Sequence, residues 1–228
     1  MCIRDRAITL TDTTVTAAAL IDLYTNGTSG VIDASTVHTI TGTTANANTI
    51  YDQTSTFTGL GTENITITGE TSNTLGAAAL NTLNGNTTGN INANTVTTLT
   101  GSISALNTAY AASASTGDGI SNLGDEAITL SDTSVTDVAA LNTLNGNTTG
   151  LIDAGTNVTS FTGSISALNT MFAAAGDSGD KIDFGGTSGA ATQTVTISDT
   201  TDVSVTGLNT LNSNTTGNID ATNVTSLA

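Results

Sequence analysis

The chain contains no proline and no tryptophan, and it has few cysteine, basic or aromatic residues. One cysteine and three lysines or arginines occur among its 228 residues, and aromatic residues make up 3%. A single cysteine excludes an intramolecular disulfide framework. With so few aromatic side chains, we expect a thin core of isoleucine, leucine, valine and alanine. No apolar run is long enough to span a bilayer as a helix, so membrane insertion is not expected.

The scarcity of basic residues leaves the chain strongly acidic, with a formal net charge of −16. Nucleic-acid binding needs clustered lysine and arginine, so this charge argues against a nucleic-acid partner. It also argues against attraction to anionic membrane surfaces. An acidic surface permits cation binding and favours solubility through charge repulsion.

What the chain does contain is a repeated ten-residue motif, Leu-Asn-Thr-Leu-Asn-Gly-Asn-Thr-Thr-Gly. It occupies Leu80–Gly89 and, without a change, Leu141–Gly150. A copy with serine in place of the first glycine occupies Leu208–Gly217, and a diverged copy occupies Leu20–Gly30. Repeats of this kind indicate stacked units that contact mainly their neighbours, and not one globular core.

The motif divides the chain into long repeat units. We assign residues 7–64, 65–126 and 127–194 to three repeat units and residues 195–228 to a partial fourth. Residues 1–6, Met-Cys-Ile-Arg-Asp-Arg, resemble a translated transposon end of the type used in sequencing adapters, and we expect them to be foreign to the fold. The alternative is a genuine short N-terminal segment. Since the last repeat unit is incomplete, we expect the chain to be an internal fragment of a longer protein.

Each long repeat unit contains two related halves, and each half begins with alternating apolar and polar residues. In the third unit, Ile128 and Leu130 flank Thr129 in the first half, and Ile152 precedes Asp153 in the second half. This period of two predicts a strand with one buried face.

The middle of each half changes to the period of a helix. Ile165, Leu168 and Phe172 are spaced i, i+3 and i+7, which places them on one face of a short helix. The pair Asn145-Gly146 predicts a left-handed residue that stops such a helix, although a hairpin turn is the alternative for Asn-Gly. The predicted helix N-caps are Ser102, Thr136 and Ser164.

Successive strands that are separated by short helices must run parallel, with right-handed crossovers. The predicted fold class is therefore α/β, a right-handed solenoid of short parallel strands and short helices. The alternative is an all-β parallel solenoid, because threonine and valine favour strands and helices of about two turns are marginal in isolation.

If the halves stack in chain order, one outward position of each strand forms a ladder along the solenoid. Threonines would alternate with acids or asparagine along this ladder. Because adjacent strands lie about 4.8 Å apart, successive aspartates would then be held about 10 Å apart. An insert that contributes a strand of its own, such as one at Ile120–Leu123, would break the ladder. The predicted members are Thr9, Asp33, Thr66, Asn92, Thr129, Asp153, Thr196 and Asp220.

The inserts between repeat units suggest a cation site. Asp177, Asp180 and Asp183 lie among glycines, and hard cations such as calcium prefer several flexible oxygen ligands. We predict these three residues as metal ligands, and calcium is the only cofactor that the sequence suggests. The alternative is that they are solvated loop acids, because neither the calcium-binding nonapeptide nor the EF-hand pattern occurs. A second acidic insert offers Asp118, Asp125 and Glu126.

No catalytic residue and no organic cofactor site are predicted. His38 is the only histidine, and we interpret it as surface variation because related halves have hydroxyl residues near this position. One histidine gives no assignable Ser-His-Asp set. A glycosidase needs two acids in unlike environments within a cleft, which a regular ladder does not provide. We therefore expect a protein that is not an enzyme.

Four segments of the repeat carry a resemblance to known proteins: Ile-Thr-Leu-Ser-Asp, Ala-Ala-Leu-Asn-Thr-Leu-Asn-Gly-Asn-Thr-Thr-Gly, Ile-Asp-Ala and Val-Thr-Ser-Phe-Thr-Gly. In this order they resemble the repeats of giant bacterial surface or secreted proteins of the cyanobacterial type. The resemblance covers residues 7–228. It implies a structural or adhesive segment of a large extracellular or cell-surface protein, whose partners are surface glycans, other cell-surface proteins and neighbouring repeats. The alternatives are a carbohydrate-binding or fibre-like solenoid, including a phage tail fibre segment, and a calcium-stabilised secreted repeat protein.

Overall fold

The computed structural model describes residues 5–113, 119–176, 179, 181–185 and 191–228. The chain divides into two compact bodies. Body 1 comprises Met1–Thr97 and Thr108–Leu123, and body 2 comprises Thr98–Asn107 and Gly124–Ala228.

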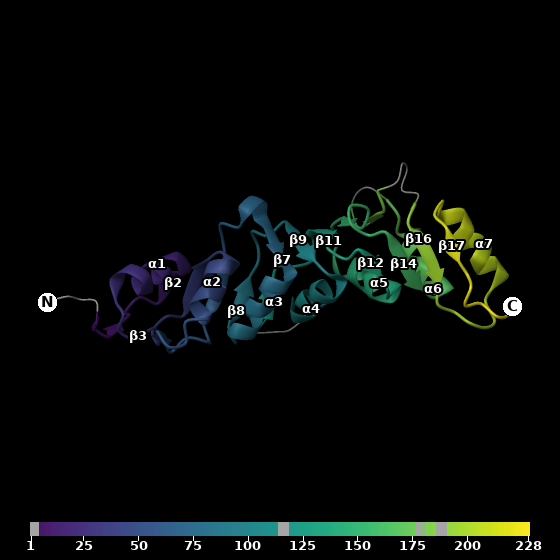
Figure 1. Cartoon of the computed structure of the whole chain (residues 1–228). Coiled ribbons are helices and arrows are strands. Elements are labelled where there is room, and N and C mark those ends of the chain that lie inside the picture. The colour runs from purple at the N-terminus through teal and green to yellow at the C-terminus, as the bar shows by residue number, and fades with distance from the viewer. Residues whose placement is uncertain (1–4, 114–118, 177–178, 180, 186–190) are drawn as a thin grey trace. The chain divides into compact units, whose positions relative to one another are not determined.

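Short strands and short helices alternate along the chain (Figure 1). The helices are α1 (Ala17–Asp22), α2 (Thr44–Tyr51), α3 (Ala77–Asn86), α4 (Ile103–Ser113), α5 (Val138–Asn147), α6 (Ile165–Ala173) and α7 (Val205–Asn214), with a π-helical turn η2 (Leu23–Gly27) and a 3-10 turn η3 (Thr71–Asn73). The strands are β1 (Ile8–Thr9), β2 (Thr14–Thr16), β3 (Ile32–Asp33), β4 (Thr39–Gly42), β5 (Phe57–Thr58), β6 (Asn64–Ile67), β7 (Thr74–Gly76), β8 (Asn90–Asn92), β9 (Thr98–Gly101), β10 (Gly119–Ser121), β11 (Ala127–Leu130), β12 (Ser134–Val135), β13 (Ile152–Asp153), β14 (Ser160–Gly163), β15 (Ile182–Asp183), β16 (Thr194–Ile197) and β17 (Ile219–Asp220).

The strands pair in parallel throughout both bodies. In body 1, β1-β3-β5 form one sheet and β10-β8-β6-β4-β2 form another, in these orders. In body 2, β15-β13-β11-β9 follow one another in a third sheet, and β12-β14-β16-β17 form the fourth. The predicted α/β class with parallel strands is therefore confirmed, and the all-β alternative is wrong because helices lie between the strands.

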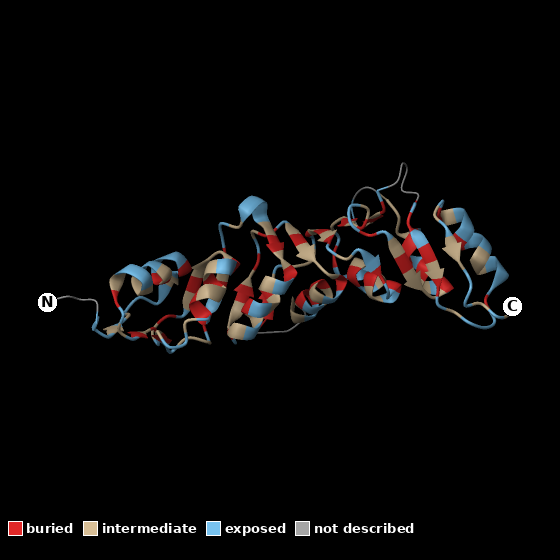
Figure 2. Ribbon diagram, viewed as in Figure 1, coloured by how far each residue is buried: buried red, intermediate tan, exposed pale blue. Residues whose placement is uncertain are grey.

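The predicted alternation of the strands builds the core. Ile40, Ile65, Ile91 and Ile120 are register partners in β4, β6, β8 and β10, and each is at most 1% exposed. Figure 2 shows buried residues on both the strands and the helices. The core is therefore a column of one or two apolar residues per strand, closed by the helices, and it needs few large side chains. In body 2 the equivalent column is Leu99, Ile128, Ile152 and Ile182.

The helices contribute the apolar face that the sequence predicts. Ile165, Leu168 and Phe172 of α6 are all buried. Phe172 packs with Phe161 and Phe184, at ring-centroid distances of 6.3 and 5.3 Å. This cluster is the aromatic part of the core in body 2.

The predicted outward ladder holds for only two strands at a time. The prediction that each pair is followed directly by the next pair is wrong, because the inserts between repeat units supply strands β5, β10 and β15. Thr58, Ser121 and Asp183 of these strands take the next positions. As a result Asp153 lies between Thr129 on one side and Asp183 on the other, so two acids are neighbours in the ladder. The pairs that the structure confirms are Thr9–Asp33, Thr66–Asn92, Thr129–Asp153 and Thr196–Asp220.

The acids of this ladder terminate their strands. Asp33 Oδ1 accepts the backbone N–H of Ser35 at 3.0 Å, and Asp220 Oδ1 accepts that of Thr222 at 2.9 Å. Hydrogen bonds from the side chain and backbone of Ser35 hold the pKa of Asp33 below its usual value. Those from the backbone and side chain of Thr222 do the same for the pKa of Asp220. The acids therefore close local turns after the strands.

The helix N-caps agree with the sequence in two of three places. Ser102 and Ser164 each accept the backbone N–H three residues further on, at 3.2 Å. The prediction of Thr136 is wrong, because the next residue, Asp137, is extended and its carboxylate accepts the first free N–H groups of α5.

The Asn-Gly pairs do not stop their helices. Gly85 and Gly146 lie inside α3 and α5, and neither has a positive φ. The helix prediction is confirmed over the hairpin, but the predicted left-handed residue is wrong. The helices end instead where Thr87 and Thr148 become extended, with φ of −132° and −128°.

Each of these threonines joins the coil that it begins to the coil before it, where a coil is a strand segment together with the helix that follows. Thr87 is 7% exposed, and its hydroxyl donates to the Glu63 carbonyl at 2.7 Å and accepts the Gly89 N–H at 3.0 Å. We call this arrangement the Thr-x-Gly bridge. It recurs at Thr28, Thr148 and Thr215, whose hydroxyls donate to the carbonyls of Arg6, Glu126 and Ala191.

The glycine of the bridge is sterically required. A Cβ atom on Gly89 would collide with the carbonyl of Glu63, and one on Gly150 would collide with that of Glu126. The backbones of neighbouring coils approach too closely at this point for any other residue.

Two further kinds of side-chain bond join a helix to a later part of the chain. A carboxylate accepts the first backbone N–H of α2, α4 and α6, where the helix leaves that group without a partner. The acids are Glu70, Asp132 and Asp199, at 2.6, 2.8 and 2.6 Å. Asparagine amides in the helices donate to carbonyls of the next helix, and the donors are Asn48, Asn107, Asn142 and Asn169, at 2.9 to 3.0 Å.

The two kinds of glycine in the motif should respond oppositely to alanine. Gly85→Ala should raise the free energy of unfolding by about 0.5–1 kcal/mol, because Gly85 is helical and its Cβ position is open. Gly89→Ala should lower it by about 3 kcal/mol or more, because the added methyl group meets the Glu63 carbonyl. Urea denaturation of the two variants measures both effects. Equal responses of the two glycines would contradict the bridge.

Candidate functional site

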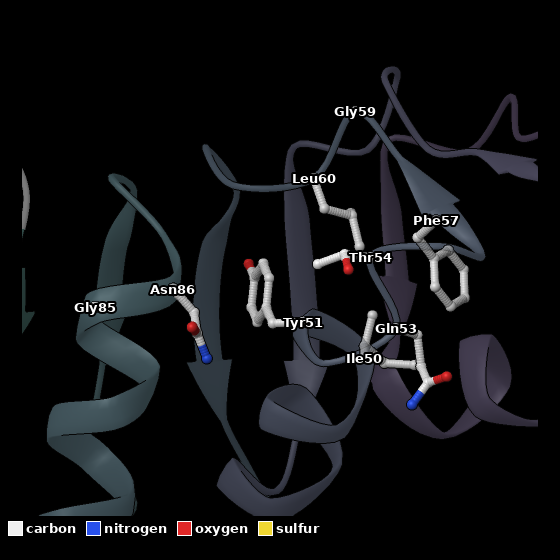
Figure 3. Close-up of a pocket in the computed structure, with 9 residues that line it drawn as sticks. All are labelled: Ile50, Tyr51, Gln53, Thr54, Phe57, Gly59, Leu60, Gly85 and Asn86. Carbon is white, nitrogen blue, oxygen red and sulfur yellow. The ribbon is translucent and has the colours of Figure 1, made fainter.

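A cavity of about 410 Å³ lies in body 1, between the turn that follows α2 and the C-terminal end of α3. Figure 3 shows Tyr51 between Asn86 on one side and Leu60 and Thr54 on the other, with Phe57 beyond Thr54. The lining residues are Ile50, Tyr51, Gln53, Thr54, Phe57, Gly59, Leu60, Gly85 and Asn86.

The local sequence places these groups. Helix α2 ends at Tyr51, and the Gln53 carbonyl then accepts the N–H groups of Thr56 and Phe57, which turns the chain into β5. Gly59 follows β5 with φ of +82°, a left-handed conformation that favours glycine. Two elements of one coil and the end of the next helix therefore surround the cavity.

One wall of the cavity is held by a buried carboxylate. Glu63 is 0% exposed, and its Oε2 accepts the Tyr51 hydroxyl at 2.9 Å and the Gly61 N–H at 2.8 Å. Its Oε1 is buried and has no hydrogen-bond partner. A buried carboxylate depends strongly on the few donors that it has.

The environment of Tyr51 keeps its phenol protonated. Burial, followed by the charge of Glu63 and the hydrogen bond to it, raises the pKa of Tyr51 well above its usual value. The hydroxyl therefore acts as a fixed donor, and the ring presents a constant surface to the cavity.

The repeats vary this pair in a coordinated way. Tyr110 stands at the position of Tyr51 in its helix and is followed by Glu126, whereas Phe172 at the same position is followed by Gln193. In the repeat unit that has phenylalanine in place of tyrosine, glutamine stands in place of glutamate. Gln193 is buried and donates to the Phe184 carbonyl at 2.9 Å instead.

The cavity is lined by apolar groups and by neutral polar groups. None of the nine residues drawn in Figure 3 carries a carboxylate, thiol or imidazole. Glu63 lies behind Tyr51 and is occupied by two donors. The arrangement can pack against an apolar surface and exchange hydrogen bonds through Gln53, Thr54 and Asn86.

The predicted metal ligands are only partly placed. Asp177 and Asp180 lie outside the residues that the structure describes. Asp183 lies in β15, where its Oδ1 accepts the Gly185 N–H at 2.7 Å. Within the described ranges, no three His, Cys, Asp or Glu residues lie close enough to hold a metal ion.

The second acidic insert is also partly outside the described residues, because Asp118 is not placed. Glu126, which the sequence suggests as a solvated loop acid or a ligand, is instead 1% exposed and accepts the Gly124 N–H at 2.9 Å. It occupies the position that Glu63 has in the preceding repeat unit, so it belongs to the core.

His38 is exposed, and its Nδ1 lies 2.6 Å from the Thr36 carbonyl. It does not line the cavity. Sequence reasoning did not find the cavity itself, although the pairing of Tyr with Glu and of Phe with Gln across the repeats was a signal for its buried wall.

None of the helices in the described part of the chain is both long and apolar enough to cross a membrane. Comparisons with protein-family models, with curated proteins and with solved structures give no match.

Tyr51 and Glu63 should be strongly coupled in a double-mutant cycle. Tyr51→Phe should lower the free energy of unfolding by about 1–3 kcal/mol, because it leaves the buried carboxylate with one donor. Adding Glu63→Gln to Tyr51→Phe should recover part of this loss, since the third repeat unit combines phenylalanine with glutamine at these positions. Urea denaturation of the four proteins gives the coupling energy, and additive effects would contradict the pair.

The raised pKa of Tyr51 should make the fold sensitive to alkali. The folded state holds the phenolic proton more tightly than the unfolded state, so this stabilisation is fully present below about pH 10 and is lost as the pH rises above it. The free energy of unfolding should therefore fall more steeply above about pH 10 in the natural chain than in Tyr51→Phe. Identical pH profiles of the two proteins would refute this assignment.

Proposed function

We propose that this chain is a segment of a right-handed α/β solenoid that serves a large extracellular or cell-surface protein as a structural and adhesive spacer without catalytic activity. One observation carries the proposal. Many polar side chains of the repeated motif are hydrogen-bonded within the fold, to the backbone of a neighbouring coil or of their own helix.

The second copy of the motif illustrates this use of its polar groups. Asn142 donates to the Ala167 carbonyl of the next helix, and Thr143 donates to the Ala139 carbonyl of its own helix. Thr148 forms the bridge to the preceding coil. Since these polar groups have backbone partners in the fold, stacking accounts for their repetition in the motif.

Several features support a solenoid. The strands are parallel, and α1 packs on α2 and α2 on α3 in body 1. In body 2, α5 packs on α6 and α6 on α7. Within each body, these successive coils therefore contact each other through both strands and helices, which is the arrangement of repeat proteins.

An extracellular or cell-surface location and an adhesive role rest on the resemblance of the motif to giant bacterial surface repeats and on the acidic, hydroxyl-rich composition. The partners that we propose are surface glycans, other cell-surface proteins and the neighbouring repeats of the parent chain. The net charge of −16 disfavours nucleic acid as a partner.

A calcium-stabilised repeat protein is the second candidate. The register pair Asp153–Asp183 favours it, because two carboxylates on adjacent strands repel each other unless a cation or solvent screens them.

Thermal melting of the chain, followed by far-UV circular dichroism with calcium and with chelator, separates the two candidates. For the spacer we expect a mixed helix and strand spectrum and one cooperative melt that chelation leaves unchanged. Limited trypsin digestion should leave residues 7–228 nearly intact, because Lys181 is their only basic residue and its carbonyl accepts the Ile152 N–H. A chain that is disordered until calcium is added would overturn the spacer in favour of the calcium-stabilised protein.

A further inference from the structure

The cavity between the turn after α2 and the end of α3 is lined by neutral polar residues as well as by apolar ones. Gln53 anchors the turn after α2 through its backbone carbonyl, and it is also one of the residues that line the cavity. Thr54 adds a hydroxyl, and Asn86 adds a second amide. The cavity volume of about 410 Å³ lies within the range of small-molecule sites in proteins.

We propose that this cavity binds one neutral sugar residue of a glycan. The proposal rests on the adhesive role proposed above and names the chemistry of the partner. Sugars carry apolar C–H faces and a rim of hydroxyl groups, and the cavity offers both complements.

The apolar complement comes from Tyr51, Phe57 and Leu60. Tyr51 and Phe57 are buried, at 9% and 5% exposure, and Leu60 is half-buried. Aromatic rings provide rigid apolar contact area at small entropic cost, which suits a weakly polar sugar face.

The polar complement comes from the two amides and the hydroxyl. An amide both donates and accepts, as a sugar hydroxyl does, so Gln53 and Asn86 can each match either role of a hydroxyl group. Asn86 is already oriented, because its Nδ2 donates to Asn48 Oδ1 at 3.1 Å.

The charge of the site selects a neutral ligand. None of the lining residues is charged, so the cavity provides neither a cation to pair an anionic sugar nor a carboxylate to hold a metal ion. The net charge of −16 further disfavours anionic ligands.

The buried carboxylate fixes the binding surface in advance. Glu63 accepts the Tyr51 hydroxyl, so the ring is held whether or not a sugar is bound. A preformed surface reduces the ordering that binding must impose, which favours a useful affinity at a small site.

The test uses the full chain and a panel of D-glucose, D-galactose, D-mannose, N-acetyl-D-glucosamine and D-glucuronate, followed by saturation-transfer NMR and titration calorimetry. We expect saturable binding of at least one neutral sugar in the millimolar range or tighter, and weaker binding of glucuronate. Gln53→Ala and Leu60→Ala should each weaken it at least about three-fold, the loss that one hydrogen bond or apolar contact gives. The matched controls Asn209→Ala and Leu227→Ala change exposed residues in body 2 and should leave binding unchanged.

No saturable binding to any neutral sugar by the folded chain would overturn the proposal, as would equal binding of glucuronate or binding that Gln53→Ala and Leu60→Ala do not alter. Melting curves recorded on the same samples separate the two proposals. A chain that melts cooperatively but binds no sugar contradicts only the sugar site, whereas a chain without a cooperative melt contradicts the spacer.

Discussion

The Thr-x-Gly bridge is the constraint on which the rest of the structure depends. The threonine hydroxyl donates to a carbonyl of the preceding coil and accepts an N–H two residues ahead, so one side chain satisfies two backbone groups that would otherwise be buried without partners. The glycine lets the two backbones approach closely enough for this exchange. The bridge threonine is also the extended residue that ends α3, α5 and α7. At these helices the bridge therefore sets the close approach of two coils, the end of the helix and the start of the next strand.

Two of the bridge carbonyls belong to buried acids. Glu63 stands directly before a strand, and its backbone carbonyl is the acceptor of Thr87. Its side chain enters the core, where Tyr51 and Gly61 satisfy one oxygen. In the third repeat unit Phe172 and Gln193 replace both members of the Tyr–Glu pair, which leaves this part of the core uncharged. In body 1 the charged pair orients Tyr51 at the wall of the cavity, so the repeat and the candidate site are linked by one carboxylate.

Much of the fold could be predicted from the sequence because its two hydrophobic periods are regular. The buried isoleucines of the strands and the apolar face of α6 were predictable from spacing alone. The ladder beyond each pair was not, because β5, β10 and β15 come from inserts with little repetition, and a two-residue strand such as Ile182–Asp183 has too short a pattern to recognise. The predictions of an N-cap at Thr136 and of a left-handed residue at Gly146 were wrong. In each case a neighbouring residue of similar propensity takes the predicted role, because Asp137 is the N-cap and α5 continues to Asn147. The cavity was not predictable, since it depends on how the turn at Gln53 packs against the end of α3, which lies about 30 residues away.

The most direct test of the central claim is native-state hydrogen exchange, measured by NMR at the backbone amides of Gly30, Gly89, Gly150 and Gly217. Each of these amides donates to a bridge threonine and follows a helix outside any strand ladder or helical hydrogen bond. If the bridges hold the coils together, Gly89 and Gly150 should exchange as slowly as the strand amides of Ile65 and Ile128, because only the separation of coils exposes them. Exchange of these glycines at the rate of exposed turns, with the strands still protected, would contradict the account.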